Sequence, residues 1–351
     1  MDFTKVKDVC LPRNLIIGHG VLSKTAEVCS NFGFGKDAML ITGHDTYKAA
    51  GKKVEEILSE EGYNVNVLKI GDATLENVDK VINVSKETHS KMLLSIGGGS
   101  KIDIGKMVSM KLSIPVISVP TSASHDGIAS GRASLKSNNG PVSIDAAVPT
   151  AVIADTEVLA HSPYRLLASG CADVVSNMTA LMDWDFARRL RNEEFSSSAY
   201  SLSRYSADAI IANSELIRPG MEESIWISIK PIIVSGLSMS IAGSSRPTSG
   251  AEHMFSHALD IDHPGKALHG EQCGVGAILM MYLHGGDWQL IRDTLKNIGA
   301  PTTAKELGLK DDDVIDAMTK AHKVRDRFTI LGDNGLSREA AETVARMTQV
   351  I

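Results

Sequence analysis

The stretch Leu93-Leu94-Ser95-Ile96-Gly97-Gly98-Gly99-Ser100-Lys101-Ile102-Asp103 decides the fold of this chain. Its first half is a short, continuous apolar run, as expected of a buried parallel strand, and a helical pattern follows the glycines. A strand, a glycine turn and a helix in this order are typical of an α/β unit that binds a phosphate at the helix N-terminus. Ser100 and Asp103 have the spacing of a capping box, so we expect them to cap this helix.

The glycine turn by itself indicates its ligand only weakly. Gly97 and Gly99 match the G-x-G-x-x-G dinucleotide pattern, but Ile102 stands at the sixth position. A tight, capped turn that binds nothing is therefore the alternative interpretation.

The same alternation of apolar runs and helical patterns extends through the first half of the chain. Strands are predicted at 14–17, 38–42, 64–70, 91–96, 115–119 and 150–154, with helices over 46–61 and 75–90. This order indicates a mostly parallel sheet with crossover helices. A small antiparallel hairpin is predicted over 132–144, with its turn at Ser137-Asn138-Asn139-Gly140.

From about Asp155 the strand patterns stop and helical patterns take over. Helices are predicted over 158–190, 196–217, 222–239, 250–259, 271–283 and 340–349. We therefore expect an α/β N-terminal domain with a mostly parallel, Rossmann-like sheet over 1–160, and an all-α C-terminal domain over 161–351. The cleft between two such domains is the expected ligand site.

Composition excludes several classes of protein. The 351 residues are 43% hydrophobic and 22% charged, which is ordinary globular usage and not that of a disordered chain, a collagen or a coiled coil. A net charge of −6 and only 5% aromatic residues argue against a nucleic-acid partner. We see no signal peptide and no apolar run near the ~20 residues that span a bilayer, so we expect a cytoplasmic protein without stable membrane insertion. None of the four cysteines has C-x-x-C spacing, which predicts reduced thiols.

A second loop of ligand-binding type follows the strand predicted at 115–119. Hydroxyl side chains and a carboxylate gather in Pro120-Thr121-Ser122-Ala123-Ser124-His125-Asp126-Gly127. Ligands of open α/β sheets bind outside the carboxyl ends of the strands, where this loop lies. Asp126 is interpreted either as a helix cap or as a carboxylate that faces the substrate.

Histidines are concentrated in one part of the predicted helical domain. His253, His257, His263 and His269 fall within seventeen residues, and His253 and His257 are one helical turn apart. Two or three histidines with a carboxylate and an open position form a Lewis-acid metal site. Asp173 lies in an otherwise apolar helical stretch and needs a partner there, so it is the expected carboxylate. The alternative is an accidental histidine pair with surface or packing roles.

Taken together, these motifs resemble a known superfamily. They are Gly97-Gly98-Gly99-Ser100-x-x-Asp103, Pro120-Thr121-Ser122-Ala123-Ser124-x-Asp126-Gly127, Gly170-x-x-Asp173, and His253 with His269-Gly270-Glu271. The resemblance is to the polyol dehydrogenase branch of the dehydroquinate synthase-like superfamily, which also holds the iron-containing alcohol dehydrogenases. Within that branch, Ser244-Ser245-Arg246-Pro247-x-Ser249-Gly250-x-Glu252-His253-x-x-Ser256-His257 is similar to the archaeal sn-glycerol-1-phosphate dehydrogenase family.

The resemblance implies a fold and a set of site residues. The fold is an α/β domain followed by a helical domain. The metal ligands are Asp173, His253 and His269, usually for zinc, with nickel or iron as alternatives. Asp126, Asp173 and His257 are placed near the substrate. The dinucleotide, NAD(H) or NADP(H), is assigned to Gly97, Gly98, Gly99, Ser100, Lys101, Ile102, Asp103, Thr121, Ser122, Ala123, Ser124 and Ser130.

The implied activity is NAD(P)H-dependent reduction of dihydroxyacetone phosphate to sn-glycerol 1-phosphate for archaeal phospholipids, by a homo-oligomer. The expected proton donor is either His257, titrating near the working pH, or a metal-bound water, and Asp126 is expected to position a substrate hydroxyl. No simple Lys/Arg motif marks a phosphate pocket. Three alternatives stay open: a polyol dehydrogenase without phosphate selectivity, a dehydroquinate synthase-like cyclase, and a non-catalytic nucleotide-binding protein. The cyclase would need more cations near the glycine loops than Lys101, Lys106 and Arg132.

Overall fold

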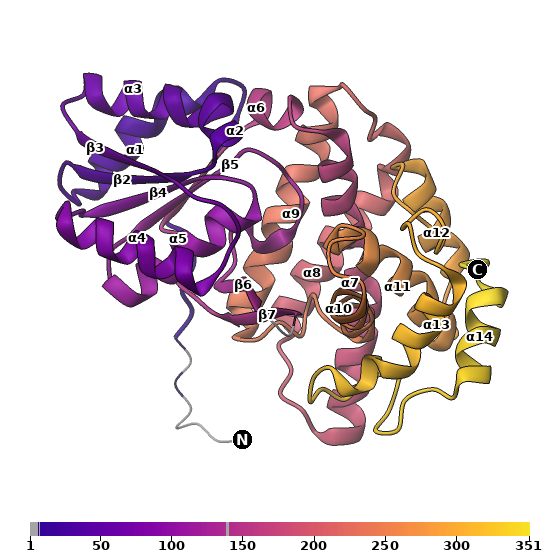
Figure 1. The fold of residues 1–351 in the computed structure, drawn as a ribbon. Coiled ribbons are helices and arrows are strands. Elements are labelled where there is room, and N and C mark those ends of the chain that lie inside the picture. The colour runs from indigo at the N-terminus through magenta and orange to yellow at the C-terminus, as the bar shows by residue number, and fades with distance from the viewer. Residues whose placement is uncertain (1–5, 7, 138–139) are drawn as a thin grey trace.

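A computed structural model describes residues 6, 8–137 and 140–351 of the chain. It has two parts that lie side by side in Figure 1, an α/β part in indigo and purple and a helical part in magenta, orange and yellow. The last strand of the sheet ends at Asp155, and helices follow from there to the C-terminus.

Six parallel strands form the central sheet, in the order β1-β8-β5-β4-β2-β3. The strands are β1 (Asn14–Gly18), β2 (Asp37–Thr42), β3 (Asn64–Lys69), β4 (Met92–Gly97), β5 (Val116–Pro120) and β8 (Ala151–Asp155). Every strand predicted for this sheet is therefore confirmed. The predicted hairpin is confirmed as well, as the antiparallel pair β6 (Arg132–Ser137) and β7 (Gly140–Asp145). Asn138 and Asn139 of its turn lie outside the described residues.

Helices cover both faces of the sheet (Figure 1). Leu40 and Leu94 pack on one face, against α1 (Thr25–Phe32) and α3 (Lys52–Glu60). Met39 and Leu93, the residues just before them, pack on the other face. That face is covered by α4 (Leu75–Glu87) and α5 (Gly99–Leu112). Because successive side chains of a strand point to opposite faces, a sheet covered on both sides needs continuous apolar runs, which is what the sequence shows.

The helical part contains all the segments predicted to be helical, with different boundaries. Its helices are α6 (Thr156–Ala160), α7 (Tyr164–Arg191), α8 (Ser197–Ala212), α9 (Glu222–Ala242), α10 (Ala251–Asp262), α11 (His269–Leu283), α12 (Trp288–Asn297), α13 (Asp311–Lys320) and α14 (Arg338–Met347). Short helical turns are η1 (Val21–Lys24), η3 (Asp126–Ile128), η4 (Ser214–Leu216) and η5 (Ala321–Lys323), and α2 (His44–Thr46) continues into the π-helical η2 (Tyr47–Gly51). Helices α1, α12 and α13 lie outside the segments predicted to be helical.

Two local predictions are wrong. The helix predicted over 158–190 is two helices, because Pro163 precedes α7 as its N-cap, and a proline in a helix interior would remove a backbone donor. The capping box of Ser100 and Asp103 does not form either. Helix α5 starts two residues earlier, with Gly98 as its N-cap, and the Asp103 carboxylate instead accepts a hydrogen bond from the backbone N–H of Ser134 at 2.9 Å.

Helix α9 is longer and more apolar than the sequence analysis allowed. By length and composition it could span a membrane, since its most apolar stretch has a mean hydropathy of 1.6, but 61% of that stretch is buried inside the protein. Ile225, Ile229, Ile232 and Ile233 belong to the main core of the helical part. The helix therefore owes its apolar character to packing.

The loop that follows β5 is held against the helical part by a close backbone contact. A Cβ on Gly170 of α7 would lie 2.0 Å from the carbonyl oxygen of Ala123. Only glycine permits this approach, and it brings the middle of α7 against the loop that carries Asp126. Gly170 therefore allows α7 and the loop after β5 to lie in direct backbone contact.

Lys106 fixes the other side of the same loop. Its side chain is fully buried on α5, and its amino group lies 2.8 Å from the Asp103 carboxylate. The amino group also donates hydrogen bonds to the carbonyl oxygen of Gly127, at 2.8 Å, and to that of Arg132. A buried charge held in this way ties α5 to η3 and to the start of β6.

We expect Lys106→Met to lower the free energy of unfolding by about 3–5 kcal/mol, because it leaves the Asp103 carboxylate buried without its counter-charge. The matched control is Lys111→Met on the same helix, whose amino group is 3.4 Å from Asp79 in an exposed pair. That control should cost about 1 kcal/mol or less. Urea denaturation of both variants measures the difference, and equal losses would contradict the role given to Lys106.

Candidate active site

A cavity of about 360 Å³ receives residues from both parts of the molecule. The α/β part contributes the start of α5 and the loop after β5, and the helical part contributes α7, α10 and α11. Of the residues that the resemblance assigns to the metal, the substrate or the dinucleotide, those that line the cavity are Gly99, Ser100, Asp103, Ser124, Asp126, Ser130, Asp173, His253, His257 and His269. The cleft expected between the two parts is thus the place where the two groups of motifs meet.

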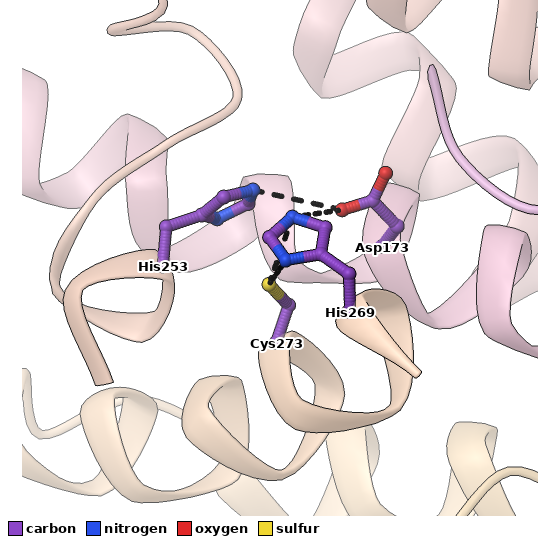
Figure 2. Close-up of side chains that lie close together, drawn as sticks. All are labelled: Asp173, His253, His269 and Cys273. Atoms are coloured by element: carbon purple, nitrogen blue, oxygen red, sulfur yellow. Dashed lines mark hydrogen bonds and ion pairs between the residues drawn. The ribbon is translucent and has the colours of Figure 1, made fainter. Parts of the chain in front are cut away.

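Asp173, His253 and His269 converge from three different helices (Figure 2). The Asp173 Oδ1 atom lies 3.6 Å from Nε2 of His253 and 3.8 Å from Nε2 of His269. Both distances exceed a hydrogen bond, so the three atoms face a common point without satisfying one another. They are also among four ligand atoms that all lie within 4.8 Å of one another.

Cys273 supplies the fourth of these atoms, and the sequence analysis missed it. Its thiol lies 3.6 Å from Nε2 of His269 and is fully buried. Burial, followed by the charge of Asp173, raises the pKa of this thiol well above its usual value. Cys273 lies one helical turn after His269 on α11, and this spacing could have indicated it as a further candidate ligand.

Hydrogen bonds around the two histidines select which ring nitrogen faces the other ligand atoms. The Nδ1 atom of His253 is 2.9 Å from the Glu252 carboxylate, so Nδ1–H donates and Nε2 is free. The Ser256 hydroxyl donates to the side-chain oxygen of Gln272 at 2.6 Å and can accept from Nδ1–H of His269 at 3.1 Å. Such outer partners orient histidine ligands in metal sites. The motif residues Glu252 and Ser256 therefore orient the rings of His253 and His269.

Buried charge determines the protonation of these groups. Burial raises the pKa of Asp173, although the neighbouring His253 opposes this rise. For His253, burial alone would lower the pKa, but the hydrogen bond and charge of Glu252 raise it overall. Burial and the proximity of His253 lower the pKa of His269 well below its usual value. A metal ion binds only the neutral ring of His253, so metal binding competes with protonation of its Nε2 atom.

The donor set fits a divalent transition metal. Imidazole nitrogen and carboxylate oxygen are the usual ligands of zinc, and three protein ligands with a further open position are typical of its catalytic sites. The Nε2 atoms of His253 and His269 lie beyond hydrogen-bond distance of the Asp173 carboxylate, which leaves room for an ion between the three side chains.

His257 and Asp126 lie in the same cavity, beside the metal-ligand group. The ring of His257 is 5.9 Å from that of His269, and its Nδ1 atom is buried with no hydrogen-bond partner among the described residues. Burial and then the nearby His269 lower the pKa of His257 well below its usual value, so the expectation that it titrates near the working pH is wrong. Asp126 starts η3, and its carboxylate accepts a hydrogen bond from Ser235 at 2.9 Å.

The two loops assigned to the dinucleotide are neighbours in space. Strands β4 and β5 pair so that Gly97 lies opposite Pro120, and the backbone N–H of Thr121 donates to the carbonyl oxygen of Gly97 at 3.1 Å. A Cβ on Gly99 would lie 1.9 Å from Nε2 of His125, so glycine at this position leaves room for the His125 side chain over the start of α5. These loops form the floor of the cavity on the side of the α/β part.

Not every residue assigned to the dinucleotide reaches the cavity. The residues that do not line it are Gly97, Gly98, Lys101, Ile102, Thr121, Ser122 and Ala123. Ile102 is buried in the main apolar core, and the carboxylate of Asp103 is engaged by Lys106 and Ser134. Lys101 extends the other way, where its amino group donates to the carbonyl oxygen of Gly71.

Several known proteins are similar to this chain along most or all of its length. A family model described as iron-containing alcohol dehydrogenase matches residues 16–163. The chain is 52% identical to a glycerol-1-phosphate dehydrogenase (NAD(P)+) of Methanosarcina mazei, over 97% of this chain and 96% of that protein. It is 50% identical to the enzyme of the same name from Methanothermobacter thermautotrophicus, over the full length of both. The crystal structure of a probable glycerol dehydrogenase from Sinorhizobium meliloti has the same fold, with a TM-score of 0.80 at 19% identity over 99% of this chain and 100% of that one.

We expect Glu252→Gln to weaken zinc binding about 10- to 100-fold. The glutamine amide lacks the negative charge with which the Glu252 carboxylate holds Nδ1–H of His253. Competition with a chromophoric chelator measures the affinity, and circular dichroism checks the fold. Glu306→Gln is the matched control, since Glu306 accepts a hydrogen bond from the backbone N–H of Thr302 at 2.7 Å and does not line the cavity. Unchanged zinc affinity in Glu252→Gln would show that this hydrogen bond does not support the metal site.

Proposed function

This chain belongs to the glycerol-1-phosphate dehydrogenase family, and we propose that it catalyses the reversible NAD(P)H-dependent reduction of dihydroxyacetone phosphate to sn-glycerol 1-phosphate. The proposal rests mainly on one observation. Gly99 and Ser100 at the start of α5 line the same cavity as the group of Asp173, His253 and His269. A dinucleotide on the first and a substrate carbonyl at the second would face each other, as hydride transfer requires.

We assign the metal ligands to Asp173, His253 and His269 and prefer zinc as the ion, with Cys273 next to them as a fourth buried donor. When bound, the metal supplies a Lewis acid for the substrate carbonyl and the reduced nicotinamide supplies the hydride. The chain itself supplies orientation. Glu252 and Ser256 hold the two histidine rings, and the backbone N–H of Asp126 donates to Oδ2 of Asp173 at 3.2 Å, which leaves Oδ1 free.

His257 and Asp126 are assigned to the substrate oxygens. A neutral His257 keeps one ring N–H, which can donate a hydrogen bond to the carbonyl oxygen and relay a proton from solvent as negative charge develops there. Burial, together with the charge of Asp173, raises the pKa of Asp126 to about 6. The carboxylate is therefore ionised at neutral pH and can accept a hydrogen bond from a substrate hydroxyl.

The proposal includes a cellular role. We place the enzyme in the cytoplasm, where its free cysteines Cys10, Cys29, Cys171 and Cys273 would stay reduced. Its product would become the glycerophosphate backbone of archaeal phospholipids, as the resemblance implies. The enzyme would work as a homo-oligomer, which light scattering can test.

A steady-state assay of dihydroxyacetone phosphate reduction tests the activity. We expect zinc-loaded enzyme to oxidise NADH or NADPH with this substrate and to produce sn-glycerol 1-phosphate, which chiral analysis of the product identifies. The principal alternative is a polyol dehydrogenase without phosphate selectivity. Efficient oxidation of glycerol, with no turnover of dihydroxyacetone phosphate, would establish that alternative instead.

We expect His257→Ala to keep stoichiometric metal but to lower kcat/KM by roughly 10²–10⁴-fold, the usual contribution of a general acid or base. Metal content is measured beside the kinetics. His263→Ala is the matched control at the end of the same helix, because its Nε2 atom is 3.3 Å from Asp313 and it does not line the cavity. Loss of metal from His257→Ala would make His257 a ligand, and full activity would remove it from the mechanism.

A further inference from the structure

Arg325 presents an uncommitted positive charge to the active-site cavity. Its side chain lines the cavity together with His257 and His269, and it also lines an adjoining pocket on the side of Arg246 and Arg327. Within the part of the chain that the structure describes, no group forms a hydrogen bond or an ion pair with its guanidinium. The guanidinium is half-buried, and its five N–H donors are available to an anionic ligand in the cavity.

The two neighbouring arginines are already committed. Arg327 donates to the Ser245 hydroxyl at 2.8 Å and to the carbonyl oxygen of Ser249. Arg246 forms a two-pronged ion pair with Glu193 and donates to the carbonyl oxygen of Phe328 at 2.9 Å. These contacts hold the segment that carries Arg325 in place and leave the Arg325 side chain free.

The other cations of the cavity wall have counter-charges. Arg132 pairs with Asp145, and Lys136 lies 2.9 Å from the carboxylate of Asp72. Among the described residues that line the cavity, Arg325 is therefore the cation without a counter-charge.

The charges around Arg325 would favour an anion. Burial, then the like charges of Arg132 and Arg246, lower the pKa of Arg325, because three arginines lie near one another here. The charge of Arg325 is also among the influences that lower the pKa values of His257 and His269. It therefore acts on the side of the cavity where the substrate carbonyl is proposed to lie.

We propose that Arg325 binds the phosphate group of the substrate and makes the enzyme select phosphorylated three-carbon ketones over unphosphorylated ones. This inference rests on the proposed function and adds the phosphate subsite that no sequence motif marked. The phosphorus of dihydroxyacetone phosphate is joined to the carbonyl carbon only through C3 and its ester oxygen. A carbonyl at the metal centre therefore places the phosphate in the same cavity, and the planar fork of a guanidinium matches two phosphate oxygens.

The first test compares two ketones, dihydroxyacetone phosphate and dihydroxyacetone, on wild type and Arg325→Gln. We expect kcat/KM for the phosphorylated ketone to fall about 10- to 100-fold, mainly through KM, as for a lost charge-assisted hydrogen bond. The fall for dihydroxyacetone should be smaller, so that the ratio of the two efficiencies drops about tenfold or more. Equal losses on both ketones, or an unchanged ratio, would overturn the proposal.

Two further variants make the comparison specific. Arg132→Gln removes a cation of the same cavity wall that is paired, and it should leave the ratio near the wild-type value. Arg325→Lys keeps the charge without the fork and should give an intermediate ratio, which also covers the case that Arg325→Gln folds poorly. A ratio that collapses in Arg132→Gln and not in the Arg325 variants would assign the phosphate to Arg132 instead.

Calorimetric titration with inorganic phosphate separates this proposal from the proposed function. If wild type does not turn over dihydroxyacetone phosphate, the proposed function is wrong, and the titration still tests Arg325. We expect wild type to bind phosphate about tenfold or more tightly than Arg325→Gln, with equal zinc content in both proteins. Equal binding by the two proteins, or no binding by wild type, would overturn the assignment of Arg325.

Discussion

The buried carboxylate of Asp173 is the group on which the rest of the site depends. A carboxylate taken out of water costs several kcal/mol unless neighbouring groups compensate it. Here the compensation comes from both parts of the molecule, because Oδ2 accepts the backbone N–H of Asp126 and Oδ1 faces His253 and His269. The carboxylate is compensated only when α7, which carries it, packs against α10, α11 and the loop after β5. The packing of these segments therefore forms the cavity and the metal site at the same time.

Charge is distributed unevenly within the cavity. Carboxylates gather around the histidines, with Asp173, Asp126 and the more deeply placed Glu252, and they suit a metal cation there. Arg325 supplies the opposite charge in another part of the wall. A substrate with a carbonyl at one end and a phosphate at the other matches both charges, whereas a neutral polyol matches only the first. Substrate choice in this fold can therefore depend on a few side chains that lie outside the metal ligands.

Helices and strands could be predicted where a run of neighbouring residues carries the pattern that identifies them. The strands of the sheet are continuous apolar runs, because helices cover both faces, and such runs stand out in the sequence. The boundaries at α5 and α7 could not be predicted as well. Gly98 takes the cap position in place of Ser100, since Asp103 pairs with Lys106 and Ser134, and Pro163 divides a helical pattern that otherwise continues.

The sequence by itself determined the residue types of the site, because His253, His257 and the glycine turn each lie in a short, recognisable pattern whose spacing follows from one helix or one strand. Tertiary structure alone decided which side chains share the cavity. Cys273 joins the metal-ligand group, and Arg325 faces the cavity with no partner among the described residues, through packing between segments that are far apart along the chain. The physical reason is that the burial of a side chain and the charges near it depend on every element packed around it. A short stretch of sequence does not contain that information.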